Sequence, residues 1–366
     1  MHVGGEPHRT IRPVADATGF EIIDQTRLPF EFVHVRIDSL DGATEAIRAM
    51  RVRGAPLIGV TAAYGVALAL RHDPTDAALE VACAALLGTR PTAVNLGWAL
   101  EQVCTEVAQA PLDERAERAW RHAGRLADTD VETCRAIGEH GLALLEKLHA
   151  DRPTRGALQV LTHCNAGWLA CVDWGTALAP VYRAHDAGLS VHVWVDETRP
   201  RNQGSLLTAW ELGQHGVPHT VVADNAGGHL MQRGKVDCCL VGTDRTTASG
   251  DVCNKIGTYL KALAARDNGV PFYVAAPSSS IDWTLDGGEQ IPIEERDENE
   301  VRQMVGIGSG GRREAVAVVP EASPVSNYAF DVTPARLVSA ILTERGACDA
   351  TPAGLAHLFP EHSSLD

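Results

Sequence analysis

Four apolar runs of this sequence end close to residues that could perform acid–base or nucleophilic chemistry. The runs cover residues 158–161, 191–195, 220–223 and 238–242. Cys164 lies shortly after the first run, and Asp196, Asp224 and Asp244 follow the other three. A thiol can act as a nucleophile or an acid, and a carboxyl group can exchange a proton when its pKa lies near the working pH. These four residues are therefore the first candidates for a reactive site.

The segments around these residues predict how they are positioned. Each apolar run is short enough to be a buried strand, and each is followed by a polar turn and then by a stretch with helical spacing. Such repeated units form parallel strands joined by right-handed crossovers. Ligands bind such sheets outside the carboxyl ends of the strands, where the strand order reverses. We therefore expect the four candidates to share one edge of a parallel sheet.

Two arginines precede predicted helices in the first part of the chain. Arg53 is followed by Gly54, Ala55 and a run of apolar helix-forming residues, and Arg90 precedes Pro91. Free backbone N–H groups and the helix dipole make a helix N-terminus a favourable place for an anion such as phosphate. Alternatively, the glycine and prolines only turn the chain, and the arginines are solvated.

A lysine occupies an unfavourable place in a third predicted helix. Asn254 and Lys255 fall at the start of a helix that we expect to run to about Ala265. A positive charge is disfavoured at a helix N-terminus unless an anion lies nearby. This placement therefore indicates ligand contact.

The remaining pattern predicts two domains. Two short strands turned at Pro29 are expected within residues 20–37, and long helices at 97–127 and 129–149. We expect a mainly helical N-terminal domain with a short β-hairpin at residues 1–128 and a Rossmann-like α/β catalytic domain at 129–366. An edge strand is expected at 315–319 and a final helix from Pro334 to Glu344.

Composition narrows the class of protein. The 366-residue chain has a formal net charge of −15, which disfavours a nucleic-acid partner because phosphate backbones require clustered lysine and arginine. No apolar stretch approaches the roughly 20 residues of a membrane span, and we expect a cytoplasmic protein without membrane contact. The nine cysteines lack a CxxC pair and suit reduced core thiols. We expect no metal ion and no dinucleotide cofactor, since DNAGGH at 224 lacks the fingerprint spacing.

Eight segments together resemble the family of methylthioribose-1-phosphate isomerases and of the regulatory subunits of the eukaryotic translation-initiation guanine-nucleotide exchange factor. They are RGAPLIGVTAAYG from Arg53, RPTAVNLGWAL from Arg90, LTHCNAG from Leu161, DETRPRNQGSLLTAWEL from Asp196, DNAGGHLM from Asp224, VGTDRTTASGDVCNKIGTY from Val241, PIEER from Pro292 and FDVTPARLVSAILTERG from Phe330. The resemblance covers about residues 20 to 346.

The resemblance implies an aldose–ketose isomerase that converts 5-methylthioribose 1-phosphate to 5-methylthioribulose 1-phosphate in methionine salvage. It implies that Cys164 and Asp244 are the catalytic pair. It further implies that the substrate is held by Arg53, Gly54, Ala55, Arg90, Gln203, Asn254 and Lys255. A homodimer, no cofactor and a small phosphorylated sugar as the only partner are also implied. The hydrogen moves between C2 and C1 as a proton or as a hydride, and the sequence leaves both open.

Plainer interpretations remain beside these. Cys164 alone would be an inert core thiol, Asp244 a helix cap, and His163 a group that satisfies a buried hydrogen bond. Asp196 would belong to an ion-pair network that shapes the turn around Gln203. Within the family, the same chemistry could act on 5-deoxyribose 1-phosphate or ribose 1,5-bisphosphate. A more distant alternative is a non-catalytic regulatory or assembly protein.

Overall fold

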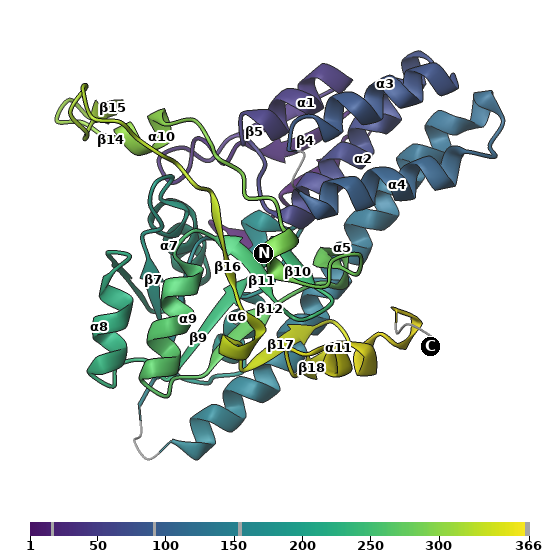
Figure 1. Ribbon diagram of the computed structural model, residues 1–366. Helices are drawn as coiled ribbons and strands as arrows, with labels where there is room; N and C mark the ends of the chain where they lie inside the picture. Colours follow the sequence, from purple (N-terminus) through teal and green to yellow (C-terminus); the bar gives the residue numbers. More distant parts are fainter. Residues whose placement is uncertain (16–17, 91–92, 153–155, 363–366) are drawn as a thin grey trace.

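A seven-stranded sheet forms the centre of the molecule (Figure 1). The computed structural model describes residues 1–15, 18–90, 93–152 and 156–362. The strand order is β18-β17-β12-β9-β6-β7-β8. The strands are β6 (Leu158–Thr162), β7 (Val191–Asp196), β8 (His219–Val222), β9 (Cys238–Gly242), β12 (Phe272–Ala275), β17 (Ala340–Thr343) and β18 (Gly346–Cys348). The described pairings are parallel except for the antiparallel pair of β17 and β18, so the predicted parallel sheet is confirmed.

The strand order reverses beside β6. From β6 the chain adds β7 and β8 on one side, then crosses back and adds β9, β12 and β17 on the other side. The switch point therefore lies between β6 and β9, whose carboxyl ends precede Cys164 and Asp244. Parallel sheets of this kind bind ligands at such a point.

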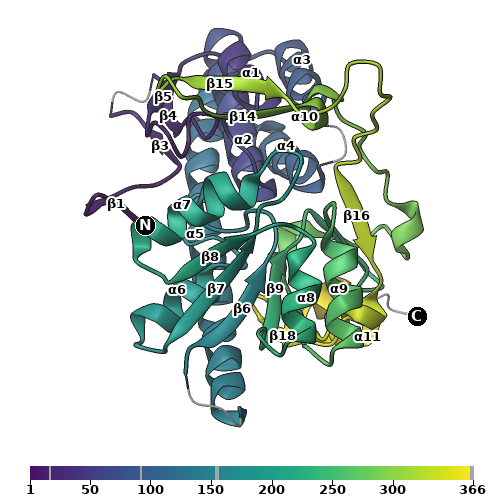
Figure 2. The same ribbon diagram turned by 90° about the vertical axis from the view of Figure 1, so that its left-hand side faces the viewer.

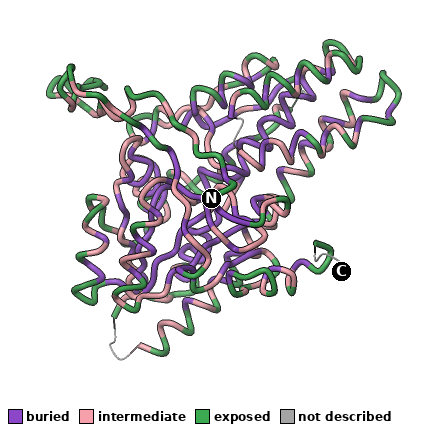
Figure 3. Tube along the Cα trace, in the orientation of Figure 1, coloured by how far each residue is buried: buried purple, intermediate pink, exposed green. Residues whose placement is uncertain are grey.

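Helices cover both faces of the sheet, as the predicted strand–helix units require. Side chains of α5, α6 and α7 pack with one face of the strands, and side chains of α8, α9 and α11 pack with the other. Figure 2 shows α8 and α9 side by side over β9. The helices are α5 (Leu112–Asp151), α6 (Ala179–Asp186), α7 (Ala209–His215), α8 (Ala226–Gln232), α9 (Thr258–Asp267) and α11 (Pro352–Leu358). Buried residues accordingly concentrate in the strands and the inner helix faces (Figure 3).

The first part of the chain forms a helical region beside the sheet. It contains α1 (Leu40–Arg48), α2 (Ala55–His72), α3 (Asp76–Leu87) and α4 (Val94–Val107), with β3 (Ile11–Pro13), β4 (Phe20–Ile23) and β5 (His34–Ile37) in one small antiparallel sheet. The strands predicted within 20–37 are therefore confirmed. The helices predicted at 97–127 and 129–149 are wrong in their bounds, because the break falls before Pro111 and α5 continues for 40 residues. The domain boundary at 128, which remains a proposal, lies inside α5.

Two further predictions of secondary structure are wrong. Asn254 and Lys255 lie in strand β11 (Val252–Lys255), which pairs with β10 (Arg245–Thr247) and β16 (Phe330–Thr333) in a four-stranded sheet with β13 (Ile281–Asp282). The final helix predicted from Pro334 to Glu344 is a 3₁₀ turn, Ala335–Leu337, followed by β17. Both strands have only four residues and are largely buried, and periodicity alone does not distinguish a buried strand from a buried helix at that length.

A hairpin projects from the body of the molecule (Figures 1 and 2). It consists of β14 (Gln303–Ile307) and β15 (Arg313–Ala317), preceded by α10 (Asn299–Arg302). The edge strand predicted at 315–319 corresponds to β15, shifted by two residues. A second small hairpin, β1 (His2–Val3) with β2 (Glu6–Pro7), lies at the N-terminus. The described residues include no helix with the length and apolarity that a bilayer crossing needs.

Candidate active site

A cavity lies where the helical region meets the carboxyl edge of the sheet. Among the predicted site residues it is lined by Arg53, Gly54, Ala55, Arg90, Cys164, Gln203, Asp244 and Lys255. Asn254 is the one predicted site residue outside this described lining, because its side-chain Nδ2 donates to Thr258 Oγ1 (3.0 Å) beneath α9. Residues from distant parts of the sequence therefore converge on one space that could hold a sugar phosphate.

Cys164 and Asp244 enter this cavity from the two strands that flank the switch point. Cys164 is 7% exposed and follows β6, while Asp244 follows β9. Burial raises the pKa of both groups, and the cations Arg53 and Lys255 oppose that effect. A raised pKa favours a protonated carboxyl group and an uncharged thiol in the empty site. The pair can therefore donate protons, which is what opening a sugar ring requires.

The backbone of Cys164 is held in an unusual conformation. Its φ angle is 67°, in the left-handed region that residues other than glycine rarely adopt. Thr198 Oγ1 accepts a hydrogen bond from the Cys164 N–H (2.8 Å), and Thr208 Oγ1 donates to the Cys164 carbonyl oxygen (2.7 Å). Asp224 accepts the N–H groups of Thr198 and Arg199, at 2.7 and 2.8 Å. Both ends of this strained residue are thus fixed by side chains.

Buried polar groups lie beside Cys164. His163 contacts Asp196 Oδ2 through Nδ1 (3.0 Å) and the Ile256 carbonyl oxygen through Nε2 (2.8 Å). Lys261 Nζ lies 3.2 Å from the same oxygen of Asp196. Asp196 and Asp224 lie at the same edge of the sheet as Cys164 and Asp244, but outside the described lining of the cavity, and Asp196 belongs to the ion-pair network that was its plainer interpretation.

The stretch around Gly54 brings the first cation to the cavity. Gly54 has a φ of 90°, and a Cβ there would lie 2.4 Å from the Ala170 carbonyl oxygen, so only glycine fits. It directly precedes α2, and Ala55, the first residue of that helix, lines the same cavity. The Arg53 guanidinium donates to the side-chain and main-chain oxygens of Asn165, the latter at 2.8 Å. These contacts aim Arg53 beside Cys164.

Arg90 is connected to a chain of ion pairs across the cavity rim. Its guanidinium lies 3.1 Å from Glu294, which contacts Arg296 at 2.7 Å. Glu300 then contacts Arg296 at 2.9 Å and Arg201 at 2.8 Å. Within the described residues, the buried Nε of Arg90 has no hydrogen-bond partner. An anion in the cavity could satisfy that donor.

Two more polar groups line the cavity with unusual surroundings. Lys255 is buried, which lowers its pKa, and its Nζ donates to the Ala329 carbonyl oxygen (2.9 Å) above the Phe330 ring. Gln203 Oε1 is buried and has no hydrogen-bond partner among the described residues. A buried acceptor without a donor is costly, and a ligand hydroxyl would relieve that cost. Both residues thus suit a polar, anionic ligand.

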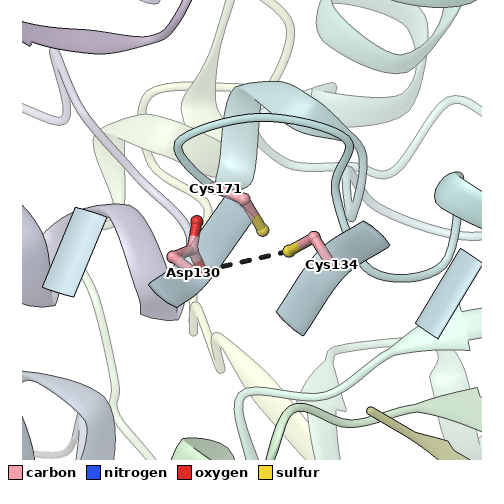
Figure 4. Close-up of side chains that lie close together, drawn as sticks. All are labelled: Asp130, Cys134 and Cys171. Carbon is pink, nitrogen blue, oxygen red and sulfur yellow. Dashed lines mark hydrogen bonds between the residues drawn. The ribbon is translucent and has the colours of Figure 1, made fainter. Parts of the chain in front are cut away.

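Two described groups have the residue types of metal ligands. In one, Asp224 and Asp196 surround His163, but Lys261 already supplies the positive charge there. In the other, Asp130 lies beside Cys134 and Cys171 (Figure 4). Burial raises the pKa of Asp130 to about 7, and the pKa of both thiols is raised, so ionised ligands are disfavoured. Hydrogen bonding within the core accounts for both groups better than a metal ion does.

Sequence reasoning missed several residues of the site. Met50, Ile58, Cys253, Ile291 and Phe330 form the apolar part of the lining, and Arg245, Ala93 and Pro292 also contribute. Thr198 and Thr208 were missed as supports of Cys164. The turn between Asp196 and Gln203, with its several polar residues after a strand, was the one available signal for Thr198.

The chain is similar, in sequence and in structure, to proteins of one family. The model of the initiation factor 2 subunit family matches residues 51–350. The methylthioribose-1-phosphate isomerase of Rhodospirillum rubrum is 61% identical over 99% of this chain and 94% of that protein. The structure of 5-methylthioribose 1-phosphate isomerase from Pyrococcus horikoshii OT3 superposes with a TM-score of 0.81 at 39% identity, covering 97% of each chain. That of translation initiation factor eIF-2B, subunit delta, from A. fulgidus gives 0.78 at 37%, covering 97% and 100%. The chain therefore belongs to the initiation factor 2 subunit family, as a full-length relative of the methylthioribose-1-phosphate isomerases.

Proposed function

We infer that this protein is an aldose–ketose isomerase that converts 5-methylthioribose 1-phosphate to 5-methylthioribulose 1-phosphate. The names of the similar proteins support this reaction, since identity is 61% over nearly the whole chain with one such isomerase. The observation that carries the proposal is the pairing of Cys164 with Asp244 at the switch point, in a cavity that also contains Arg53, Arg90 and Lys255. A regulatory protein would have no need for a thiol and a carboxyl group placed together beside clustered cations.

The residue types match the steps of such a reaction. Arg53, Arg90 and Lys255 supply positive charge for the phosphate at C1, and the N-terminus of α2 adds backbone donors. The three cations oppose the raised pKa of Asp244. A bound phosphate neutralises their charge and so removes that opposition. Asp244 is then protonated, and it donates that proton to the ring oxygen as the ring opens. Cys164 faces the carbons between which hydrogen moves.

A neighbouring cavity supports a small apolar group at C5. This cavity, about 1010 Å³, shares Met50, Arg53 and Gln203 with the first. Much of its wall is apolar, with Leu28, Phe30, Pro200, Leu206, Leu207 and Val305. The wall also contains two further cations, Arg201, which is paired with Glu300 at 2.8 Å, and Arg313. The apolar part of the wall suits a methylthio group, and the substrate comparison below tests this against the second phosphate of ribose 1,5-bisphosphate.

The test is turnover of the purified protein, without added metal or nucleotide, on three substrates. These are 5-methylthioribose 1-phosphate, 5-deoxyribose 1-phosphate and ribose 1,5-bisphosphate, with ketose formation followed in each case. A clear preference for the first supports the proposal. Comparable rates on the first two would mean that the C5 cavity accepts both, and no turnover on any of the three would overturn the proposal.

The fate of the transferred hydrogen is read from the same reaction in D₂O. Deuterium at C1 of the ketose means that Cys164 or Asp244 moved a proton that exchanged with solvent. Complete retention of the substrate hydrogen is the result that a hydride shift predicts, in which Cys164 only borders the moving atom. Either result assigns a distinct role to the thiol.

The proposal extends to the setting of the enzyme. A cytoplasmic homodimer in methionine salvage suits a protein whose described residues contain no membrane-spanning helix and whose relatives bear the isomerase name. Light scattering on the purified chain tests the dimer. A monomer at micromolar concentration would contradict that part of the proposal and leave the catalytic part standing.

A further inference from the structure

Two cysteine side chains face each other in the helical region, away from the catalytic cavity. Cys83 on α3 and Cys104 on α4 bring their Sγ atoms to 3.2 Å. Both residues are partly exposed, whereas Cys164 is buried. A disulfide has an S–S length of about 2.05 Å, so the two sulfur atoms need to approach by only about 1 Å.

The two thiols also have unequal acidity. The hydrogen bond from Cys83 lowers the pKa of Cys104 to about 7, and the same contact raises the pKa of Cys83. The shared hydrogen bond therefore favours a thiolate at Cys104, and the thiolate is the reactive form. An accessible thiolate with a second thiol beside it is the usual arrangement of a cysteine pair that reacts with oxidants.

A second pair of neighbouring thiols provides the contrast. Cys134 on α5 lies beside Cys171 and Asp130 (Figure 4), and both cysteines are completely buried. The adjacent Cys171 thiol and burial raise the pKa of Cys134. The thiols of Cys134 and Cys171 are close together, but they are neither exposed nor acidic. A comparison of the two cysteine pairs therefore separates the effect of proximity from the effect of thiol reactivity.

We propose that Cys83 and Cys104 form an oxidation site at which hydrogen peroxide makes a reversible intramolecular disulfide. The Cys104 thiolate attacks one peroxide oxygen, the O–O bond breaks, and the leaving hydroxide takes up a proton to become water. Cys83 then loses its proton and attacks the sulfenic sulfur of Cys104. The S–S bond forms, the S–O bond breaks, and a second water leaves. In sum, two thiols are oxidised and one peroxide is reduced to two waters.

The cross-link would join α3 to α4 and close the stretch of chain that contains Arg90. Closing a loop of this size stabilises a folded protein mainly by restricting the unfolded chain. We expect the midpoint of thermal unfolding to rise by roughly 5 °C on oxidation and to return on reduction. Neither cysteine lines the catalytic cavity, so the site is independent of the proposed isomerase activity.

The test treats the whole protein with one equivalent of hydrogen peroxide at neutral pH and maps disulfides by peptide mass spectrometry. The expected product is a peptide pair joined through Cys83 and Cys104, with the loss of two hydrogen atoms, which dithiothreitol restores. The unfolding midpoint of wild type should rise on oxidation, and that of Cys83→Ser and Cys104→Ser should not. Cys348→Ser is the matched control, and it should respond to oxidation as wild type does. Cys348 is also partly exposed, but burial raises its pKa to about 11.

Three results would overturn the proposal. The first is free Cys83 and Cys104 thiols after the treatment, and the second is a cross-link that forms no faster than one between Cys134 and Cys171. The third is a disulfide that leaves the unfolding midpoint unchanged, which would remove the stabilising role of the link. Because mapping uses the wild-type chain, the test holds even if a serine variant fails to fold.

Discussion

The helical region and the sheet region contribute different kinds of group to one cavity. The helical region supplies Arg53 and Arg90 from loops before helices, and their guanidinium groups contact Asn165 and Glu294 of the other region. The sheet region supplies Cys164, which is buried, and Asp244, which is half-buried, at adjacent strand ends. Charge for binding and groups for proton transfer thus come from separate parts of the chain. The site therefore forms only where the two regions pack together.

The largest effect is expected from removing the reactive groups of the sheet region. Cys164→Ala and Asp244→Asn should each lower kcat by about 10³-fold or more, because acid–base groups contribute roughly 10²–10⁴-fold to such reactions. Substrate binding, measured by calorimetry, should stay within about tenfold of wild type. Wild-type turnover in either variant would show that the sheet region does not supply the reactive groups.

A smaller effect on a different parameter is expected from the helical region. Arg53→Ala should raise KM by roughly 10- to 100-fold, since a hydrogen bond to a charged group contributes about 1.5–3 kcal/mol. Turnover at saturating substrate should fall much less. Steady-state kinetics separate the two parameters, and Arg48→Ala on the exposed face of α1 is the control. An unchanged KM with a reduced kcat would show that Arg53 belongs with the reactive groups instead.

An intermediate test asks whether the conformation of Cys164 matters as well as its thiol. Thr198→Val keeps the shape of the side chain but removes the oxygen that accepts the Cys164 N–H. We expect kcat to fall roughly tenfold, about the loss of one buried hydrogen bond, with KM little changed. Thr198→Ser restores the oxygen and should recover most of the rate. Equal kcat in the valine and serine variants would contradict a positioning role.

The smallest effect concerns the pH dependence of stability. Burial raises the pKa of Glu211 from 4.5 to about 8, and its side chain accepts a hydrogen bond from Asn165 Nδ2 (2.6 Å). The folded state therefore binds more protons than the unfolded state between these pH values, and stability falls as pH rises through that window. Glu211→Gln should weaken this decline between pH 6 and 8 by about 2 kcal/mol, as urea unfolding would measure.

The matched control for this test lies in the helical region. Glu114 forms an exposed ion pair with Arg118 on α5 at 2.7 Å. Such pairs contribute at most about 1 kcal/mol, and Glu114→Gln should leave the slope of stability against pH unchanged. If the two variants behaved alike, burial would not be the cause of the wild-type slope.

Much of the sheet was predictable because buried parallel strands have a distinctive composition. β6, β7, β8 and β9 were predicted as apolar runs that end in polar turns, and their carboxyl edge identified Cys164 and Asp244. β11 and β17 were misassigned, because a four-residue buried run has no period that separates a strand from a helix. The break before α5 was missed because helical composition continues on both sides of Pro111.

The support of the site was much less predictable than its reactive groups. Thr198 and Thr208 are ordinary turn and helix residues in the sequence, and they acquire a role only by lying on either side of Cys164. Gln203 came from the family resemblance alone. Side chains that contact each other across 30 or 40 residues leave no periodic signal for a single sequence to show.

The sequence by itself determined the strands β6, β7, β8 and β9, the residues that follow them, and the two arginines that stand before helices. These features follow from local composition, because the tendency of a segment to be buried and its backbone propensity depend on its own residues. The tertiary structure alone decided that Asp196 and Asp224 support the site while Cys164 and Asp244 line it. The reason is strand order, since the crossover that places β9 beside β6 is a long-range choice that local sequence does not encode.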